Sequence, residues 1–279
     1  MTNKNHKRIN KVITVAILSF YSFFSLIPLW YILNNAFKTR EAIIKTPYYL
    51  TPETFDLSGI IGVFTSMGYP SLLKNSVTYL VLASTVMIIC GGMAGFALGL
   101  SRSKKMKILN YFITCLITVP FQVYMIPLVI VMRQLGIIST YVGVSLVFAS
   151  VSLPFTIFLY TGFVKTVPRE LYEAAKVDGA STFQILVKIY MPLMKAVTGS
   201  VLILRGVSIW NNEIIPIVTV HQTAKYTLVL GLYRYVSANT TKWDYVFGAS
   251  LLVSLPITIL FLLFQKSFVK GITSGSVKG

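Results

Sequence analysis

The sequence predicts an all-α membrane protein with six transmembrane helices. Its 279 residues are 55% hydrophobic and only 12% charged, whereas about a quarter of the residues in a soluble domain are charged. Six stretches are long and apolar enough to cross a bilayer, because a spanning helix needs roughly 20 mostly apolar residues. The net charge of +17 comes from short basic clusters between these stretches. That pattern is typical of membrane proteins and argues against a nucleic-acid-binding surface.

The predicted spans divide the chain into a core and flanking segments. The first span is too long for the apolar part of a signal peptide and no small-residue cleavage site follows it, so we expect it to be retained. The six spans cover residues 12–33, 75–100, 108–132, 141–164, 196–220 and 245–264. The predicted parts are a basic N-terminus at 1–11, the first span at 12–33, an outer loop at 34–74, a transmembrane core at 75–266 with a loop at 165–195, and a tail at 267–279.

The distribution of lysine and arginine predicts that both termini are cytoplasmic. Cytoplasmic connections of membrane proteins carry an excess of these residues. Here the excess lies before the first span, between spans 2 and 3, between spans 4 and 5, and after the sixth span. These four segments share one side of the membrane only if the number of spans is even, which agrees with six.

Small residues and prolines mark most of the spans. Gly91, Gly95 and Gly99 recur at four-residue spacing in the second span, and such a stripe predicts close approach of a neighbouring helix. The other five spans contain Pro28, Pro120 and Pro127, Pro154, Pro216, and Pro256. Proline kinks can line a transport path, but proline is also common in membrane helices generally, and both roles remain open.

The loop at 165–195 has the sequence of two short helices joined by a bend. Pro168 suits the first position of a helix, and Glu173 lies near the positive end of that helix. Asp178-Gly179 predicts its end. Ser181 followed three residues later by glutamine predicts a capping box that starts a second helix, which Pro192 should end.

This loop closely resembles the EAA loop of the permeases of binding-protein-dependent ABC importers, and we call residues 165–195 the coupling loop. The wider match covers nearly the whole chain after about residue 10 and resembles the carbohydrate-uptake branch, in particular the maltose-type G component. The motifs that carry it are Asn75-Ser76, Ser101-Arg102, Met125-Ile126-Pro127, Trp210-Asn211-Asn212-Glu213, and the C-terminal segment 265–279. The coupling loop indicates the importer class, and the C-terminal segment narrows the solute to a carbohydrate.

The resemblance implies a transport subunit of the bacterial cytoplasmic membrane with a defined set of partners. These are a second homologous permease, two ATPase subunits that bind ATP and Mg, an extracellular solute-binding protein, membrane lipid and the sugar. The chain itself should hold no cofactor, because it lacks a Gly-x-x-x-x-Gly-Lys-Ser/Thr phosphate loop. Two histidines and two cysteines, the latter within apolar runs, also predict no metal site. It is therefore expected not to be an enzyme.

Three groups of residues take their expected roles from the resemblance. ATPase coupling is assigned to Glu173, Ala174, Ala175, Asp178 and Gly179, with Glu173 as the acid that meets the ATPase and the small residues as positions of close contact. The resemblance also implies that four residues of the tail lie near the interface between the ATPases: Gly275, Val277, Lys278 and Gly279. The segment at 221–243 should face the sugar-binding protein.

The fifth span supplies candidate residues for a translocation path: Arg205, Trp210, Asn211 and Glu213. Arg205 lies outside the family pattern, and an ionisable residue at membrane depth is a functional candidate. It either hydrogen-bonds sugar hydroxyls, pairs with the partner permease or has a structural role between helices. Because Arg205 and Glu213 are about 12 Å apart along a helix, we expect no direct pair between them. In the maltose-type family the partner permease makes most sugar contacts, so no sugar contact is assigned here.

Other function classes fit the sequence less well. An ABC importer for another small solute remains an alternative. A secondary transporter usually needs carboxylates at membrane depth, and only Glu213 falls within a predicted span. The chain shows no nucleophile–base set of an enzyme and no filter-like segment of a channel.

Overall fold

The computed structural model describes the backbone of residues 2–236 and 242–276 and the side chains of residues 10–236 and 242–263. These residues form helices and loops and no β-strand. Four helices are long and apolar enough to cross a membrane, and the number rises to six if each of two bent helix pairs is one span. The four lie in α1 (Thr2–Ala36), α4 (Tyr69–Leu100), α7 (Tyr141–Val164) and α14 (Trp243–Ser276).

The predicted third span is a bent pair instead of one straight helix. It consists of α5 (Lys104–Cys115) with the 3-10 turn η2 (Leu116–Thr118), and of α6 (Phe121–Gln134). The two parts meet at 99°. Pro120 stands at the bend as the cap of α6, where its missing N–H and its restriction of the preceding residue interrupt the helix.

The predicted fifth span is also interrupted. Helix α11 (Lys195–Trp210) ends at Trp210, and α12 (Ile214–Thr219) begins four residues later. The Asn212 side chain accepts a hydrogen bond from the backbone N–H of Ile215 at 2.9 Å, which satisfies a free donor at the new helix start. Glu213 occupies the position before the first residue of α12 and does not lie within a continuous span.

The chain divides into two compact units. Unit 1 comprises Met1–Tyr69 with Leu232–Leu255, and unit 2 comprises Pro70–Gly231 with Pro256–Gly279. Besides α1, unit 1 contains α2 (Arg40–Lys45), η1 (Pro52–Thr54), α3 (Ser58–Ser66) and η5 (Tyr233–Tyr235). Unit 2 also contains α8 (Glu170–Val177), α9 (Thr182–Ile185), η3 (Leu186–Tyr190), α10 (Met191–Leu193), η4 (Thr223–Lys225) and most of α13 (Leu228–Leu232).

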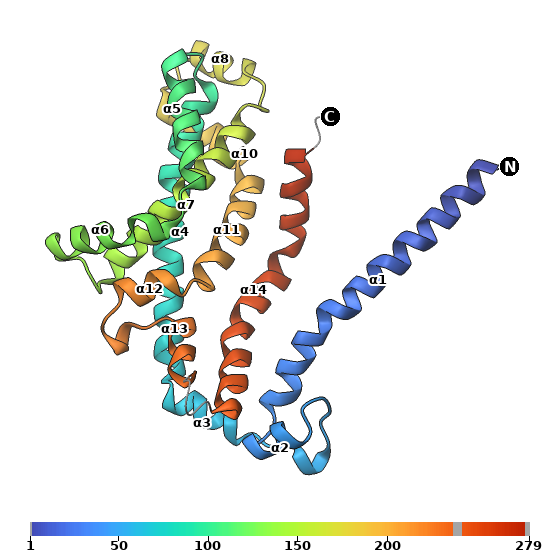
Figure 1. Cartoon of the computed structure of the whole chain (residues 1–279). Coiled ribbons are helices and arrows are strands. Elements are labelled where there is room, and N and C mark those ends of the chain that lie inside the picture. The colour runs from blue at the N-terminus through green and yellow to red at the C-terminus, as the bar shows by residue number, and fades with distance from the viewer. Residues whose placement is uncertain (1, 237–241, 277–279) are drawn as a thin grey trace. The chain divides into compact units, whose positions relative to one another are not determined.

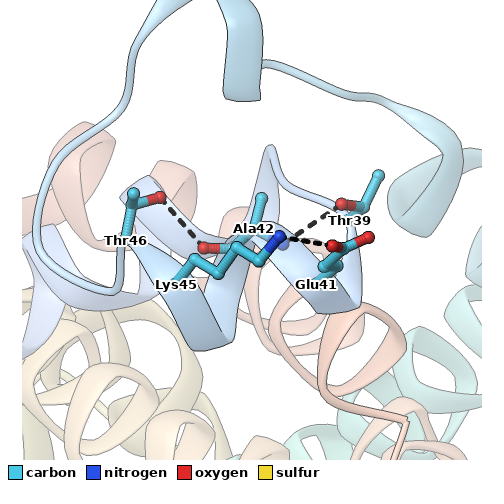
Figure 2. A network of polar contacts seen from close by, with 5 residues as sticks. All are labelled: Thr39, Glu41, Ala42, Lys45 and Thr46. Atoms are coloured by element: carbon cyan, nitrogen blue, oxygen red, sulfur yellow. Dashed lines mark hydrogen bonds and ion pairs between the residues drawn. The ribbon is translucent and has the colours of Figure 1, made fainter.

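Helix α2 in unit 1 is closed at both ends by short polar contacts. The Thr39 hydroxyl accepts from the backbone N–H of Ala42 at 3.3 Å, and the Thr46 hydroxyl donates to the Ala42 carbonyl at 2.9 Å (Figure 2). Lys45 and Glu41 form an ion pair at 2.6 Å. Since both of their side chains are at least 70% exposed, the pair contributes little, and the caps define the helix.

Three buried polar side chains fasten this region to the end of α1. The amides of Asn34 and Asn35 both donate to the carbonyl of Pro47, at 2.8 and 3.0 Å. The Lys38 ammonium is fully buried and donates to the carbonyl of Thr46, and its burial lowers the pKa of this lysine. The predicted outer loop therefore begins with an ordered structure.

Unit 2 has two hydrophobic cores along α4 and α7. One core joins these helices to α6, α11 and α12 through Tyr79, Met87, Met132, Phe148, Ile209 and Ile215. The other joins their opposite ends to the coupling loop through Phe96, Tyr160, Ala175, Ile185, Tyr190 and Met194.

The glycine stripe of α4 lies directly against α7, as its spacing predicts. A Cβ atom on Gly95 would lie 2.3 Å from the Cβ of Tyr160, and one on Gly91 or Gly99 would lie 2.5 Å from a side-chain carbon of Thr156 or Val164, respectively. No larger residue fits at these separations. The stripe thus sets the distance between the two helices.

We predict that Gly95→Ala destabilises the protein by about 1–3 kcal/mol, because the new methyl group overlaps Tyr160. The matched control is Gly162→Ala in α7, where an added Cβ meets nothing within 4 Å. Because alanine favours a helix more than glycine, the control should be neutral or stabilising. Thermal unfolding of the purified protein in detergent measures both variants, and equal midpoints would contradict this account.

Candidate functional site

The coupling loop contains the predicted bend and capping box. Helix α8 ends at Val177, and Gly179 has a φ angle of +80°, a left-handed conformation that favours glycine. The backbone N–H of Ser181 donates to the Gln184 side chain at 2.8 Å, and the N–H of Gln184 donates to the Ser181 hydroxyl at 3.2 Å. The predicted capping box is confirmed.

The helix limits differ from the predicted ones. Helix α8 begins at Glu170, two residues after Pro168. After the bend, α9 continues into a π-helical segment, η3, and then into α10, which ends at Leu193, one residue after Pro192. Helical structure resumes at once in α11, and the two parts form the second bent pair, with an angle of 70°.

The coupling loop packs on the adjacent ends of α4 and α7. Tyr190 is fully buried, and its ring lies edge-on to Phe96 of α4 with 4.9 Å between centroids. Tyr160 of α7 belongs to the same cluster. Within unit 2, α8 and α5 lie toward one end, and α12 and α13 lie toward the other (Figure 1). The buried cluster holds the coupling loop at one end of the helix pair.

An ionic contact adds a second attachment between α8 and α4. Arg169 donates from Nε to Glu173 at 2.9 Å and from Nη1 to the carbonyl of Leu100 at 3.2 Å. Leu100 is the last residue of α4, and its carbonyl lacks a partner within the helix. Glu173 thus already has a partner within the chain, and it stays 59% exposed on its outer side.

The exposed face of the coupling loop is apolar at several positions. Val177 is 88% exposed and Phe183 is 66% exposed, which is unusual for large apolar side chains on a polar loop. Leu171 and Ala174 are exposed as well. We call Leu171, Ala174, Val177 and Phe183 the exposed apolar face.

One of the residues expected to contact the ATPase is buried. Ala175 is 8% exposed and packs in the cluster with Tyr160 and Tyr190, whereas Ala174 is exposed. Asp178 and Gly179 are exposed at the bend and line a hollow of about 450 Å³. The other residues that line this hollow are Ala175, Ala180, Gln184, Ile185, Lys188 and Ile189.

Sequence reasoning did not single out Arg169, Val177 and Phe183. The arginine lies four residues before Glu173, the spacing of an ion pair on one helix face, so this signal was available. The valine and phenylalanine have no such signal, because which side of a short helix faces outward depends on its packing against α4 and α7.

A buried polar network holds the segment after α12 at the opposite end of unit 2. Asn75 donates to the carbonyls of Ala224 and Tyr226 at 2.9 and 3.0 Å and accepts from the Tyr141 hydroxyl at 2.6 Å. The Ser76 hydroxyl accepts from the N–H of Leu228 at 2.8 Å. The Asn75-Ser76 motif therefore fixes part of the segment at 221–243.

The candidates for the translocation path lie in different environments. Trp210 is 4% exposed, so its ring is unavailable for stacking on a sugar in this structure. Asn211 is exposed at the end of α11, and Glu213 is half-buried as the cap of α12. Arg205 is half-buried, with its guanidinium 4.0 Å from the centre of the Phe155 ring. In the described part of the chain Arg205 and Glu213 form no ion pair, as expected.

Of the four C-terminal candidates, one lies within the described residues. Gly275 lies in the last turn of α14, whereas Val277, Lys278 and Gly279 fall outside the described residues. Within the described residues, no three histidine, cysteine, aspartate or glutamate side chains group together as metal ligands would.

Residues 87–274 match the family described as binding-protein-dependent transport system inner membrane component. The matched region runs from α4 through α14 and includes the whole coupling loop. The chain is also 28% identical to the arabinooligosaccharides transport system permease protein AraQ of Halalkalibacterium halodurans, over 100% of both chains. It is 31% identical to the melibiose/raffinose/stachyose import permease protein MelC of Bacillus subtilis, over 71% of this chain and 72% of the relative.

A solved structure shares the fold. It is a bacterial ABC transporter involved in the import of the acidic polysaccharide alginate, and one of its chains superimposes with a TM-score of 0.77 at 23% identity. The superposition covers 94% of this chain and 97% of that chain.

We predict that Arg169→Met loosens the coupling loop, because it removes the contact with the Leu100 carbonyl. Backbone amides of α8 should then exchange faster with deuterium, measured by mass spectrometry of the purified protein. The control is Lys188→Met, which removes an exposed positive charge from the same loop. Equal protection of α8 in both variants would show that the arginine does not hold it.

Proposed function

Because the chain belongs to the family of binding-protein-dependent transport system inner membrane components, we propose that it is the permease subunit of an ABC importer for a sugar or oligosaccharide. The coupling loop carries this proposal, because it combines a rigid attachment to α4 and α7 with an exposed apolar face. AraQ and MelC, which are named for oligosaccharide transport and import, support a carbohydrate as the solute. An importer for another small solute is the alternative.

ATP hydrolysis takes place on partner subunits in this proposal. Two ATPases bind ATP and Mg, and one of them receives the exposed apolar face in a groove. Burial of a large apolar side chain contributes about 1.5–3 kcal/mol, so Val177 and Phe183 supply much of the docking energy. Glu173, at the rim of this face, meets a basic residue of the ATPase while Arg169 keeps it in place.

The attachments of α8 explain how ATPase motion reaches the membrane helices. Arg169 links α8 to the end of α4, and the cluster around Tyr190 links the coupling loop to α7. A pull on α8 therefore moves both helices together, as a rigid-body change. ATP binding opens the path outward, the sugar enters from the binding protein, and hydrolysis resets the path toward the cytoplasm.

The solute-binding protein docks on the opposite side of the membrane in this proposal. The segment at 221–243 faces it, and the Asn75 network holds the first part of that segment against unit 2. A second homologous permease completes the path. The chain is then a multi-pass protein of the bacterial cytoplasmic membrane.

Six spans with cytoplasmic termini are the topology we propose. It counts the α5–α6 pair as one span and α11 with α12 as another, and it places the basic clusters on the cytoplasmic side. The segment at 221–243 is then extracellular and the coupling loop cytoplasmic.

We predict that a cysteine at His221 reacts with a membrane-impermeant maleimide in intact cells, whereas one at Lys176 reacts only after permeabilisation. The test uses a Cys90→Ser, Cys115→Ser background, because both native cysteines are free and exposed. The reverse pattern of labelling would indicate the inverted topology. Labelling of both sites in intact cells would exclude the proposed topology.

Docking of the ATPase is tested by Val177→Asp. A carboxylate at the most exposed apolar position should lower ATPase co-purification at least about tenfold, since burying an unpaired charge is costly. The control, Val236→Asp, makes the same change at an exposed valine of unit 1 and should retain the ATPase. Equal retention by the two variants would rule out the coupling loop as the docking surface.

A sugar screen on the reconstituted complex tests the transport function. The full complex in proteoliposomes, with its binding protein, should hydrolyse ATP faster when one class of oligosaccharide is present. Stimulation by amino acids or metal ions in place of any sugar would favour the alternative solute.

A further inference from the structure

Arg205 lies in the middle of α11, away from both ends of the helix. It follows Lys195, the first residue of α11, by ten positions, or about 15 Å of helix. Its guanidinium lies 4.0 Å from the centre of the Phe155 ring of α7. This cation–π contact stabilises the guanidinium, whose planar group can donate paired hydrogen bonds.

The positive charge of Arg205 has no partner carboxylate in the described part of the chain. The ion pairs found there are Lys45 with Glu41 and Arg169 with Glu173. The Nε atom of Arg205 is buried without a hydrogen bond. A charge and an unsatisfied donor at membrane depth are costly, and they indicate that an anion from outside this chain completes the site.

Two aromatic side chains lie near the positive charge of Arg205. Phe155 is half-buried, and Phe158, whose ring centre lies 6.5 Å from that of Phe155, is 47% exposed. The apolar face of a sugar ring packs well on such side chains. The planar guanidinium forms paired hydrogen bonds with a carboxylate better than with a hydroxyl group.

We propose that Arg205, on its Phe155 platform, binds a carboxylate of the transported solute, so that the importer takes sugars containing uronic acid. This inference rests on the proposed function and specifies its substrate class. A carboxylate of the partner permease is the competing source of the anion. The substrate is favoured because the cation–π contact with Phe155 offsets part of the cost of the unpaired charge while the site is empty, as a site that fills and empties in each cycle requires.

The test uses the complete complex with its binding protein in proteoliposomes. Uptake is measured for neutral and uronate-bearing oligosaccharides of equal length, such as galactotriose and trigalacturonate. The variants are Arg205→Gln and Arg205→Lys, and Arg133→Gln serves as the control because Arg133 is an exposed arginine of α6.

The wild-type complex should import the uronate-bearing sugar. Arg205→Gln should lower this uptake by about ten- to a hundredfold, the range expected for loss of a charged hydrogen bond. Arg205→Lys should retain part of it, since the charge remains and the planar fork is lost. Arg133→Gln should leave uptake and the basal ATPase rate unchanged, and all variants should retain the partner permease.

Two results would overturn the inference and leave the proposed function intact. One is import of the neutral sugar alone, unchanged in Arg205→Gln. The other is loss of the partner permease from Arg205→Gln, with Arg205→Lys restoring it, which would assign the anion to that partner. An assembled wild-type complex that imports neither class of sugar would count against both the inference and the proposed function.

Discussion

The close contact between α4 and α7 is the constraint on which the rest of unit 2 depends. Gly91, Gly95 and Gly99 leave no space for a side chain between the helices, so the two helices are fixed along much of their length. At one end Phe96 and Tyr160 build the cluster that receives the coupling loop. Toward the other end Asn75, on α4, and Tyr141, on α7, share the hydrogen bond that anchors the segment after α12. The surfaces proposed for the ATPase and for the binding protein are thus attached to the same helix pair.

In the coupling loop, the residues suited to supply docking affinity differ from those that orient α8. Exposed ion pairs such as Arg169 with Glu173 contribute about 0–1 kcal/mol, less than burial of one large apolar side chain. The ionic contact is better suited to orient α8, because Arg169 also reaches the last carbonyl of α4. The apolar side chains of Val177 and Phe183 are largely exposed and are suited to supply affinity. Both properties require the left-handed bend at Gly179, which turns α9 back toward the core.

Local signals in the sequence predicted local features well. Hydrophobic length located the long helices, the glycine spacing predicted the α4–α7 contact, and Ser181 with Gln184 predicted the capping box. Features decided by three-dimensional packing were missed. The bend at Pro120 interrupts a mostly apolar run, so hydropathy alone does not show it. The break after Trp210 falls on the polar residues Asn211, Asn212 and Glu213, which the predicted fifth span included. Ala175 matches the family motif but faces the interior, since its orientation follows from the position of Tyr190. The arginine at 205 was recognisable as unusual, whereas its contact with the Phe155 ring depends on how α11 packs against α7.

The most direct test of the account is photo-crosslinking from position 183 in the assembled complex. Phe183 is exposed on α9, and benzoylphenylalanine in its place keeps an aromatic side chain there. The account predicts a covalent adduct with an ATPase subunit that forms in membranes containing the whole complex. An adduct with the solute-binding protein, or no adduct in a complex that retains its ATPases, would contradict the coupling loop as the contact between this permease and its motor.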